Sequence, residues 1–356
     1  MSHRTFKGKT ILIVGGAGFV GSNLTHRLLD DGPAKLIVVD NLLSADISNL
    51  PEDPRVDFRF GSITSDKILH GLPDTLDFVF HLATYHGNQS SMHDPLADHE
   101  NNTYTTLKLL ERLKDVKGLE AVVYSSAGCT VAQKTFDDAK PTTEDDPVSL
   151  YLDSPYQMSK IFGEFYGNYY WMRHGIPFIK ARFQNVYGPR EIPGAGQWRG
   201  TPSTVWRNVT PTFIWKSMNH EALPIEKGGV ATRDFIYVDD IVAGLMACAL
   251  RGKAGDVYNL ASGVETTIRE LAETINRLTG NPTPLLIAPA RDWDRSGKRF
   301  GETTKAEREI GFKPVMPLDE GLKRTVAWMR DNKAIIERCI AQHRRYLKTE
   351  DRRAAE

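Results

Sequence analysis

The sequence has little cysteine, no long apolar run and no excess of charge of either sign. Its three cysteines, Cys129, Cys248 and Cys339, lie far apart and form no Cys-x-x-Cys pair. This spacing argues against a disulfide framework and against a zinc site, and it favours reduced thiols in the cytoplasm. No apolar stretch of about 18 residues occurs, so we expect no segment that spans a bilayer. Lys+Arg and Asp+Glu both number 45, which predicts no general attraction to nucleic acid or to an anionic membrane.

The composition is that of a folded chain with a substantial core. Of 356 residues, 40% are hydrophobic and 25% are charged, which suits one large domain or two ordinary ones. Short apolar runs alternate with helical patterns at 10–14, 36–40, 56–60, 77–82, 121–125 and 178–183. Such runs are typical of strands buried on both faces of a parallel sheet. The sequence therefore predicts an α/β fold, a Rossmann-type doubly wound parallel sheet.

A glycine cluster follows the first predicted strand. Gly15, Gly18 and Gly21 stand three residues apart where a strand ends and a helix begins. This context favours a dinucleotide site, because the turn lets the backbone approach a pyrophosphate at the positive end of the helix dipole. Asp40 ends the second predicted strand, where a carboxylate accepts hydrogen bonds from the ribose 2′-hydroxyl and repels a 2′-phosphate. The pattern predicts NAD rather than NADP.

A second cluster carries acid–base chemistry. Tyr156 and Lys160 are spaced i, i+4, so they share one face of a helix that Ser154 caps and Pro155 opens. A lysine ammonium favours the phenolate form, which lets Tyr156 take a proton from a sugar hydroxyl. Ser125 and Ser126 end the fifth predicted strand, where such folds place their ligands.

These residues together resemble the extended short-chain dehydrogenase/reductase family, in particular its NAD-dependent nucleotide-sugar epimerases and dehydratases of the UDP-glucose and UDP-glucuronate 4-epimerase kind. The resemblance covers about residues 9–330. It is carried by the stretches 15–21, 81–83 with Asp94-Pro95 and Asn102, 125–127, 155–160, 182–190 and 233–240.

The resemblance implies a division into an NAD-binding domain at 1–185 with the catalytic helix, a smaller α/β domain at 186–332 that holds the nucleotide sugar, and a helical or frayed tail at 333–356. The chain is expected to cross back near 230–260. It also implies a cytoplasmic homodimer. The implied catalytic residues are Ser126, Tyr156 and Lys160. The implied cofactor contacts are Gly15, Gly18, Phe19, Val20, Asp40, Asn41, Ser62, Ile63, Leu82, Ala83, Thr84, Asn102, Ser125, Tyr156 and Lys160. The implied substrate contacts are Ser126, Asn185, Arg207, Arg233 and Arg299, with a UDP-sugar favoured and no metal expected.

One departure from the family pattern bears on the reaction. Dehydratases of the family carry Asp and Glu after the fifth strand, whereas here residues 126–131 read Ser-Ala-Gly-Cys-Thr-Val. Loss of water needs a general acid, so the sequence favours C4 epimerisation through a 4-keto sugar. A 4,6-dehydratase with another acid and a net sugar oxidoreductase remain the alternatives. The other departures indicate a distinct subgroup, which we associate with polysaccharide biosynthesis.

The segment after 189 is rich in arginine and tryptophan. Arg190, Arg199 and Arg207 suit bidentate binding of a carboxylate, which suggests an acidic or acylated sugar. A basic loop that contacts only phosphates or a partner chain explains the same residues equally well.

Overall fold

The computed structural model describes residues 4–128, 137–289 and 297–348. A seven-stranded parallel sheet forms the larger part, with the strand order β11-β6-β5-β4-β1-β2-β3. The predicted doubly wound α/β fold is confirmed. Its strands are β1 (Thr10–Val14), β2 (Lys35–Asp40), β3 (Val56–Phe60), β4 (Phe78–His81), β5 (Ala121–Ala127), β6 (Phe178–Phe183) and β11 (Val257–Leu260).

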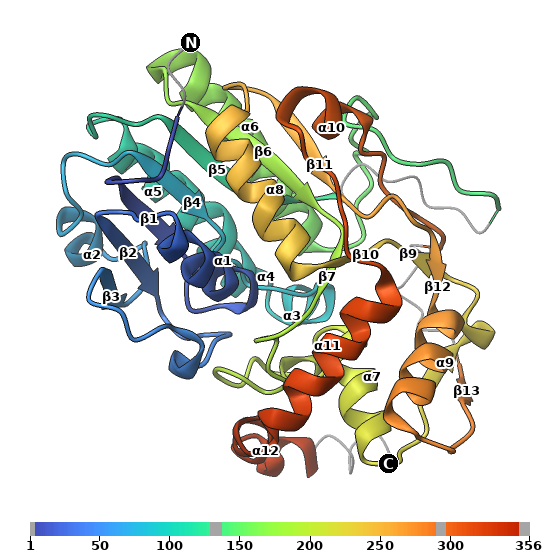
Figure 1. Ribbon diagram of the computed structural model, residues 1–356. Coiled ribbons are helices and arrows are strands. Elements are labelled where there is room, and N and C mark those ends of the chain that lie inside the picture. The colour runs from blue at the N-terminus through green and yellow to red at the C-terminus, as the bar shows by residue number, and fades with distance from the viewer. Residues whose placement is uncertain (1–3, 129–136, 290–296, 349–356) are drawn as a thin grey trace.

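Alternate residues of each central strand feed two cores, one on each face of the sheet. In β1, Ile11 and Ile13 pack into one core, and Leu12 and Val14 pack into the other. This two-residue period is that of a strand buried on both sides. Helices α1 (Phe19–Asp30) and α8 (Val238–Arg251) cover the first face, which is the nearer one in Figure 1. The other face carries α2 (Asp66–His70), α5 (Thr105–Leu113) and α6 (Pro155–His174).

Residues 95–114 carry a long helical pattern in the sequence but do not form one regular helix. The chain forms α3 (Asn88–His93), α4 (Pro95–Asp98), a π-helical turn at His99–Tyr104 and then α5. A π-turn widens the helix locally and is common near functional sites.

A smaller α/β unit lies at the lower right of Figure 1 and has its own core, which includes Phe213, Leu271 and Met329. Its helices are α7 (Val209–Met218), α9 (Ile268–Thr279), α11 (Leu318–Asp331) and α12 (Lys333–Ala341). Three two-stranded pairs accompany them: β7 (Asn185–Tyr187) with β10 (Phe235–Tyr237), β9 (Thr232–Arg233) with β12 (Thr266–Thr267), and β8 (Pro224–Glu226) with β13 (Leu286–Ala288).

The chain returns to the large sheet between these pairs, because α8 packs on that sheet and β11 forms its edge strand. Helix α10 (Thr304–Ile310) then packs beside α8 and β11. None of the helices in the described ranges is long and apolar enough to cross a membrane.

Helix α6 positions the central side chains of the site. The side chain of Ser154 accepts the N–H of Gln157, Pro155 occupies the first turn, and Gly175 ends the helix with φ +69°. The places of Ser154 and Pro155 are those that the sequence predicts. Gly163 and Gly167 bring the helix against the sheet, since a Cβ at these positions would lie 2.1 Å from the Tyr124 hydroxyl and 1.8 Å from the Phe178 ring.

Candidate active site

A cavity of about 610 Å³ lies between the carboxyl ends of the central strands and the smaller unit. Parallel α/β sheets bind their ligands at this edge. Every residue that the sequence predicted for the cofactor or the substrate lines this cavity, with the exception of Asn102. One end is formed by the glycine turn and Asp40, the middle by β5 and α6, and the far end by residues of the smaller unit.

The glycine turn has the geometry that a dinucleotide requires. Gly15 has φ +84°, and a Cβ there would lie 2.5 Å from the backbone nitrogen of Ala83. At Gly21 a Cβ would lie 2.2 Å from the Gly15 carbonyl oxygen, so only glycine lets α1 begin this close to β1. Gly18 provides the N-cap of α1 without a side-chain hydrogen bond, which leaves the amides of the first turn available to phosphate oxygens.

Asp40 is held in place at the end of β2. Its carboxylate accepts the N–H of Ala17 at 3.0 Å and of Leu42 at 2.8 Å. Burial raises the pKa of this carboxyl, and the backbone amides act in the opposite direction. Ser62 and Ile63, beyond β3, also line this end. These residues suit the adenosine half of NAD, for which folds of this type use a carboxylate at the end of the second strand to accept from the ribose hydroxyls.

Asn102 has a different place from the one predicted. Its amide oxygen accepts the Tyr85 N–H at 2.7 Å and the Thr84 hydroxyl at 3.1 Å, and its NH₂ donates to Asp98 at 2.7 Å and to Ser159 at 3.2 Å. Burial raises the pKa of Asp98 to about 6. Asn102 therefore fixes the loop after β4, and Thr84 of that loop lines the cavity.

Tyr156 and Lys160 come to the cavity from the same face of α6. Lys160 is 3% exposed and donates through Nζ to the carbonyl oxygen of Ser125 at 2.8 Å. This nitrogen lies 5.9 Å from the centre of the Tyr156 ring. The ammonium group is thus fixed beside the tyrosine, as the i, i+4 spacing predicted.

His86 is a residue of the site to which the sequence gave no role. It lines the cavity, and its ring meets that of Tyr156 edge-on with the ring centres 5.7 Å apart. Burial lowers the pKa of His86 to about 3, and the guanidinium groups of Arg207 and Arg199 act in the same direction, so the ring is neutral.

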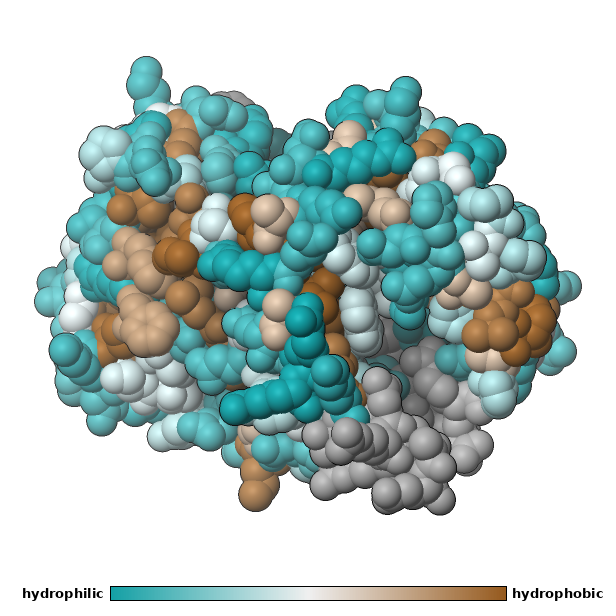
Figure 2. All heavy atoms as spheres, turned by 90° about the horizontal axis from the view of Figure 1, so that it is seen from below, coloured by the Kyte–Doolittle hydropathy of each residue, from teal (hydrophilic) through white to brown (hydrophobic). Residues whose placement is uncertain are grey.

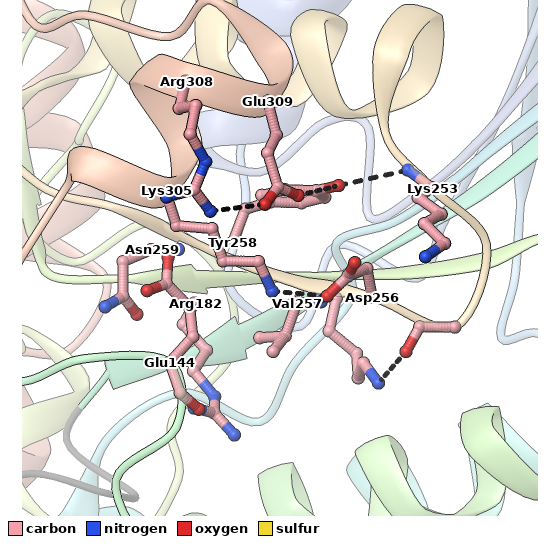
Figure 3. A network of polar contacts seen from close by, with 12 residues as sticks. Glu144, Arg182, Lys253, Asp256, Val257, Tyr258, Asn259, Lys305, Arg308 and Glu309 are labelled. Atoms are coloured by element: carbon pink, nitrogen blue, oxygen red, sulfur yellow. Dashed lines mark hydrogen bonds and ion pairs between the residues drawn. The ribbon is translucent and has the colours of Figure 1, made fainter.

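Ser126 is buried and its hydroxyl donates to Glu164 at 2.5 Å. Glu164 stands one turn beyond Lys160 on α6, and both of its oxygens accept from Arg182 of β6 at 2.9 Å. Arg182 also donates to the Glu144 carbonyl, and the Glu144 carboxylate accepts the N–H of Asn259 (Figure 3). Sequence reasoning missed Glu164, although the spacing 156, 160, 164 could have indicated it.

The far end of the cavity is basic. Arg233 donates to the carbonyls of Thr232 and Gly297, both at 2.7 Å. The Nε of Arg299 is buried and has no hydrogen-bond partner among the residues that the structure describes. Asn185 is placed by the pairing of β7 with β10 and by its N–H, which donates to the Asp234 carbonyl at 2.9 Å. A buried arginine Nε such as that of Arg299 suits a phosphate oxygen.

The arginines of the 190–207 loop bind the protein itself. Arg190 donates to Asn23 at 2.9 Å, Arg199 to the His86 carbonyl at 3.0 Å, and Arg207 to the Ser44 and Ala195 carbonyls at 3.1 Å. Arg199 also stacks over Tyr85 and is 5% exposed. These contacts anchor the loop, and none of them favours a sugar carboxylate over the other interpretation. Cys129 and the rest of 129–136 lie outside the described residues.

No group of three or more His, Cys, Asp or Glu side chains suited to a metal ion occurs in the described part of the chain. The three histidines 81, 86 and 93 do not converge on such a site. His81 instead contacts Thr106 at 2.9 Å beneath the cavity.

Comparison with known proteins supports this reading of the cavity. The model of the NAD dependent epimerase/dehydratase family matches residues 11–261. The chain is 31% identical to a UDP-glucose 4-epimerase of Mycolicibacterium smegmatis over 325 residues, which are 90% of this chain and 98% of that protein. It is 27% identical to a dTDP-glucose 4,6-dehydratase of Streptomyces antibioticus over 91% of this chain and 93% of that protein.

A solved structure is more similar still. The Bordetella bronchiseptica enzyme WbmF in complex with NAD⁺ is 56% identical, with a TM-score of 0.88 over 97% of this chain and 99% of that one. The same enzyme has been solved with NAD⁺ and UDP together, again with a TM-score of 0.88.

Proposed function

This chain belongs to the NAD dependent epimerase/dehydratase family, and we propose that it epimerises a UDP-sugar at C4 through a transient 4-keto sugar. The predictions that it is an enzyme of this family and that its cofactor is NAD are confirmed. The observation that carries the reaction is one cavity that joins the glycine turn, the Tyr156–Lys160 pair and a basic far end.

The residues of the chain divide the work as follows. Tyr156 takes the proton from the C4 hydroxyl and returns it to the same oxygen after the 4-keto sugar has turned its opposite face to the cofactor. Lys160, fixed on the Ser125 carbonyl, favours the phenolate and would hold the nicotinamide ribose. Bound NAD would supply a hydride acceptor at C4 and return the hydride in the same turnover, so the reaction would need no second substrate.

The substrate end is proposed for the UDP moiety. Asn185, Arg233 and Arg299 line that end and offer an amide and two guanidinium groups to a diphosphate. The UDP in the WbmF structure supports this choice of nucleotide. The identity of the sugar is left to experiment, since the loop arginines are engaged with the protein.

Loss of water is the second candidate reaction, because dehydratases are among the relatives. Its acid is not supplied by Ser126 and Ala127, which end β5, or by Gly128, the one described residue of the segment that follows. Glu191 lines the cavity, and burial raises the pKa of its carboxyl to about 7. It is the first residue to replace if a dehydrated product is found.

A substrate labelled with deuterium at C4 distinguishes the two reactions. Epimerisation returns the label to C4 of the product, slows turnover and proceeds without added cofactor. Transfer of the label to C6 would contradict the proposal, because a 4,6-dehydratase makes that transfer. Loss of the label to the cofactor pool would instead indicate a net oxidoreductase.

Two broader features belong to the same proposal. We propose a homodimer that pairs through α6, whose Phe162, Phe165 and Tyr169 are 49%, 55% and 51% exposed. Exposed aromatic residues on one helix are typical of an interface. We also propose a cytoplasmic role in polysaccharide biosynthesis, consistent with the free thiols of Cys248 and Cys339. Light scattering on the purified enzyme tests the dimer: a monomeric mass contradicts it.

A further inference from the structure

The 190–207 loop lies directly against the cofactor end of the cavity. The Gln197 N–H donates to the Leu43 carbonyl at 3.0 Å, and Arg207 donates to the Ser44 carbonyl. A Cβ at Gly196 would lie 2.3 Å from the Leu43 carbonyl oxygen. Leu43 and Ser44 follow Asp40 by three and four residues and line the cavity, as do Ile192 and Ala195 of the loop itself.

Residues 333–348, called here the C-terminal segment, contact the 190–207 loop on the side away from Leu43 and Ser44. Gln342 donates through Nε2 to the Gly194 carbonyl at 2.8 Å and to the Gly196 carbonyl at 3.0 Å. His343 Nε2 lies 2.9 Å from the same Gly194 oxygen. The rings of Trp198 and Tyr346 stack with their centres 4.9 Å apart and their planes 9° apart. The loop after β2 that contains Leu43 and Ser44, the 190–207 loop and the C-terminal segment therefore form three successive layers.

Helix α12 holds the outer layer in place. Ile336 and Cys339 are buried in the core of the smaller unit. Arg338 forms an ion pair at 2.8 Å with Asp46, which lies in the loop after β2 and 292 positions earlier in the sequence. Asp46 also caps the 3₁₀ turn Ile47–Asn49. The helix lies at the bottom of Figure 1, on the largely hydrophilic face that Figure 2 shows. Residues 333–348 are thus docked onto the rest of the fold.

From this layering we infer that the C-terminal segment retains NAD by positioning the 190–207 loop over the cofactor end. Gln342 and Tyr346 are positioning residues, since they act through Gly194, Gly196 and Trp198 and do not line the cavity. A reaction that regenerates its cofactor in every turnover gains from slow release. Opening the cofactor end requires the loop to leave Leu43 and Ser44, and the tail holds the loop there.

The test is the release of NADH, followed by nicotinamide fluorescence after a chase with excess NAD⁺. The double variant Gln342→Ala/Tyr346→Ala should release NADH about tenfold faster, equivalent to a tenfold change in Kd at an unchanged association rate. Its kcat at saturating NAD should stay near that of the wild type, because Tyr156 and Lys160 are untouched. Arg344→Ala, an exposed position in the same segment, is the matched control.

Trp198→Leu removes the loop's half of the Trp198–Tyr346 stack and should also make NADH release faster. This variant keeps the test decisive if the tail variant is poorly folded, and the melting temperature without cofactor reports a purely structural role. Release rates within twofold of the wild type for both variants would overturn the inference. The release measurement contains no sugar, so its result is independent of the proposed reaction.

Discussion

The hydroxyl of Ser126 lies 2.5 Å from the carboxylate of Glu164, so this serine, one of the implied catalytic residues, is itself held by a buried ion pair. Glu164 and Arg182 are 7% and 6% exposed at their side chains. If one partner is removed, water therefore cannot reach the other to solvate its charge. The pair also connects α6 with β6 of the sheet.

Glu164→Gln should lower both stability and kcat. Removing one charge leaves Arg182 buried without a counter-ion, for which we expect a loss of about 3 kcal/mol in the free energy of unfolding. We expect kcat to fall at least tenfold while KM changes less, because the amide has one acceptor oxygen for the donors of Ser126 and Arg182 and so orients the Ser126 hydroxyl less firmly. Urea unfolding and steady-state kinetics measure the two effects.

The control for this variant is Glu273→Gln, which removes an exposed pair and should change stability by less than about 1 kcal/mol. Ser126→Ala made in both backgrounds completes a double-mutant cycle. Additive effects on kcat would show that Glu164 does not act through Ser126.

Asp40→Asn should weaken the preference for NAD over NADP. The amide keeps an acceptor for one of the two backbone N–H groups, those of Ala17 and Leu42, and removes the negative charge that repels a 2′-phosphate. NADH affinity should fall about tenfold, and the NADPH to NADH ratio of Kd values should shrink by more than that. Fluorescence titration measures both constants. The exposed Asp30→Asn variant is the control, and its ratio of Kd values should equal that of the wild type. The same unchanged ratio in Asp40→Asn would show that Asp40 does not select the cofactor.

His81 should make the protein less stable as the pH falls. The Thr106 hydroxyl donates to the Asn102 carbonyl and so accepts from His81, which fixes the neutral Nε2–H tautomer. Burial lowers the pKa of His81 from 6.5 to about 3. Below the unfolded value the unfolded chain binds a proton that the folded chain does not, so stability is lost progressively from pH 6.5 toward pH 3.

His81→Gln tests this linkage. It should remove about 2 kcal/mol from the decline in stability between neutral pH and a pH of about 5, since glutamine can donate to Thr106 without titrating. His70→Gln on the exposed end of α2 is the control. Urea unfolding at the two pH values gives the comparison, and parallel declines in wild type and His81→Gln would show that His81 is not responsible.

The sequence predicts what depends on local spacing. The glycine turn, Asp40, the capped helix with Tyr156 and Lys160, and the strands of the large sheet are each read from a few neighbouring residues, and the structure brings them to one cavity.

The sequence does not predict contacts that depend on the tertiary fold. The π-turn rotates Asn102 toward Thr84 and Tyr85, so a residue expected at the cofactor supports the loop instead. Glu164 meets Ser126 where Gly163 and Gly167 let α6 lie close to Tyr124 of β5 and Phe178 of β6. The pairing of Arg338 with Asp46 joins residues that no local pattern relates.

The most direct test of the account is mass-detected chromatography of the purified enzyme with a panel of nucleotide sugars, neutral and uronic, without added NAD. A C4-epimerase should give a new peak of unchanged mass from a UDP-sugar. The Tyr156→Phe variant should give no such peak and should still bind NADH. A product lighter by one water, or undiminished turnover by Tyr156→Phe, would contradict the account.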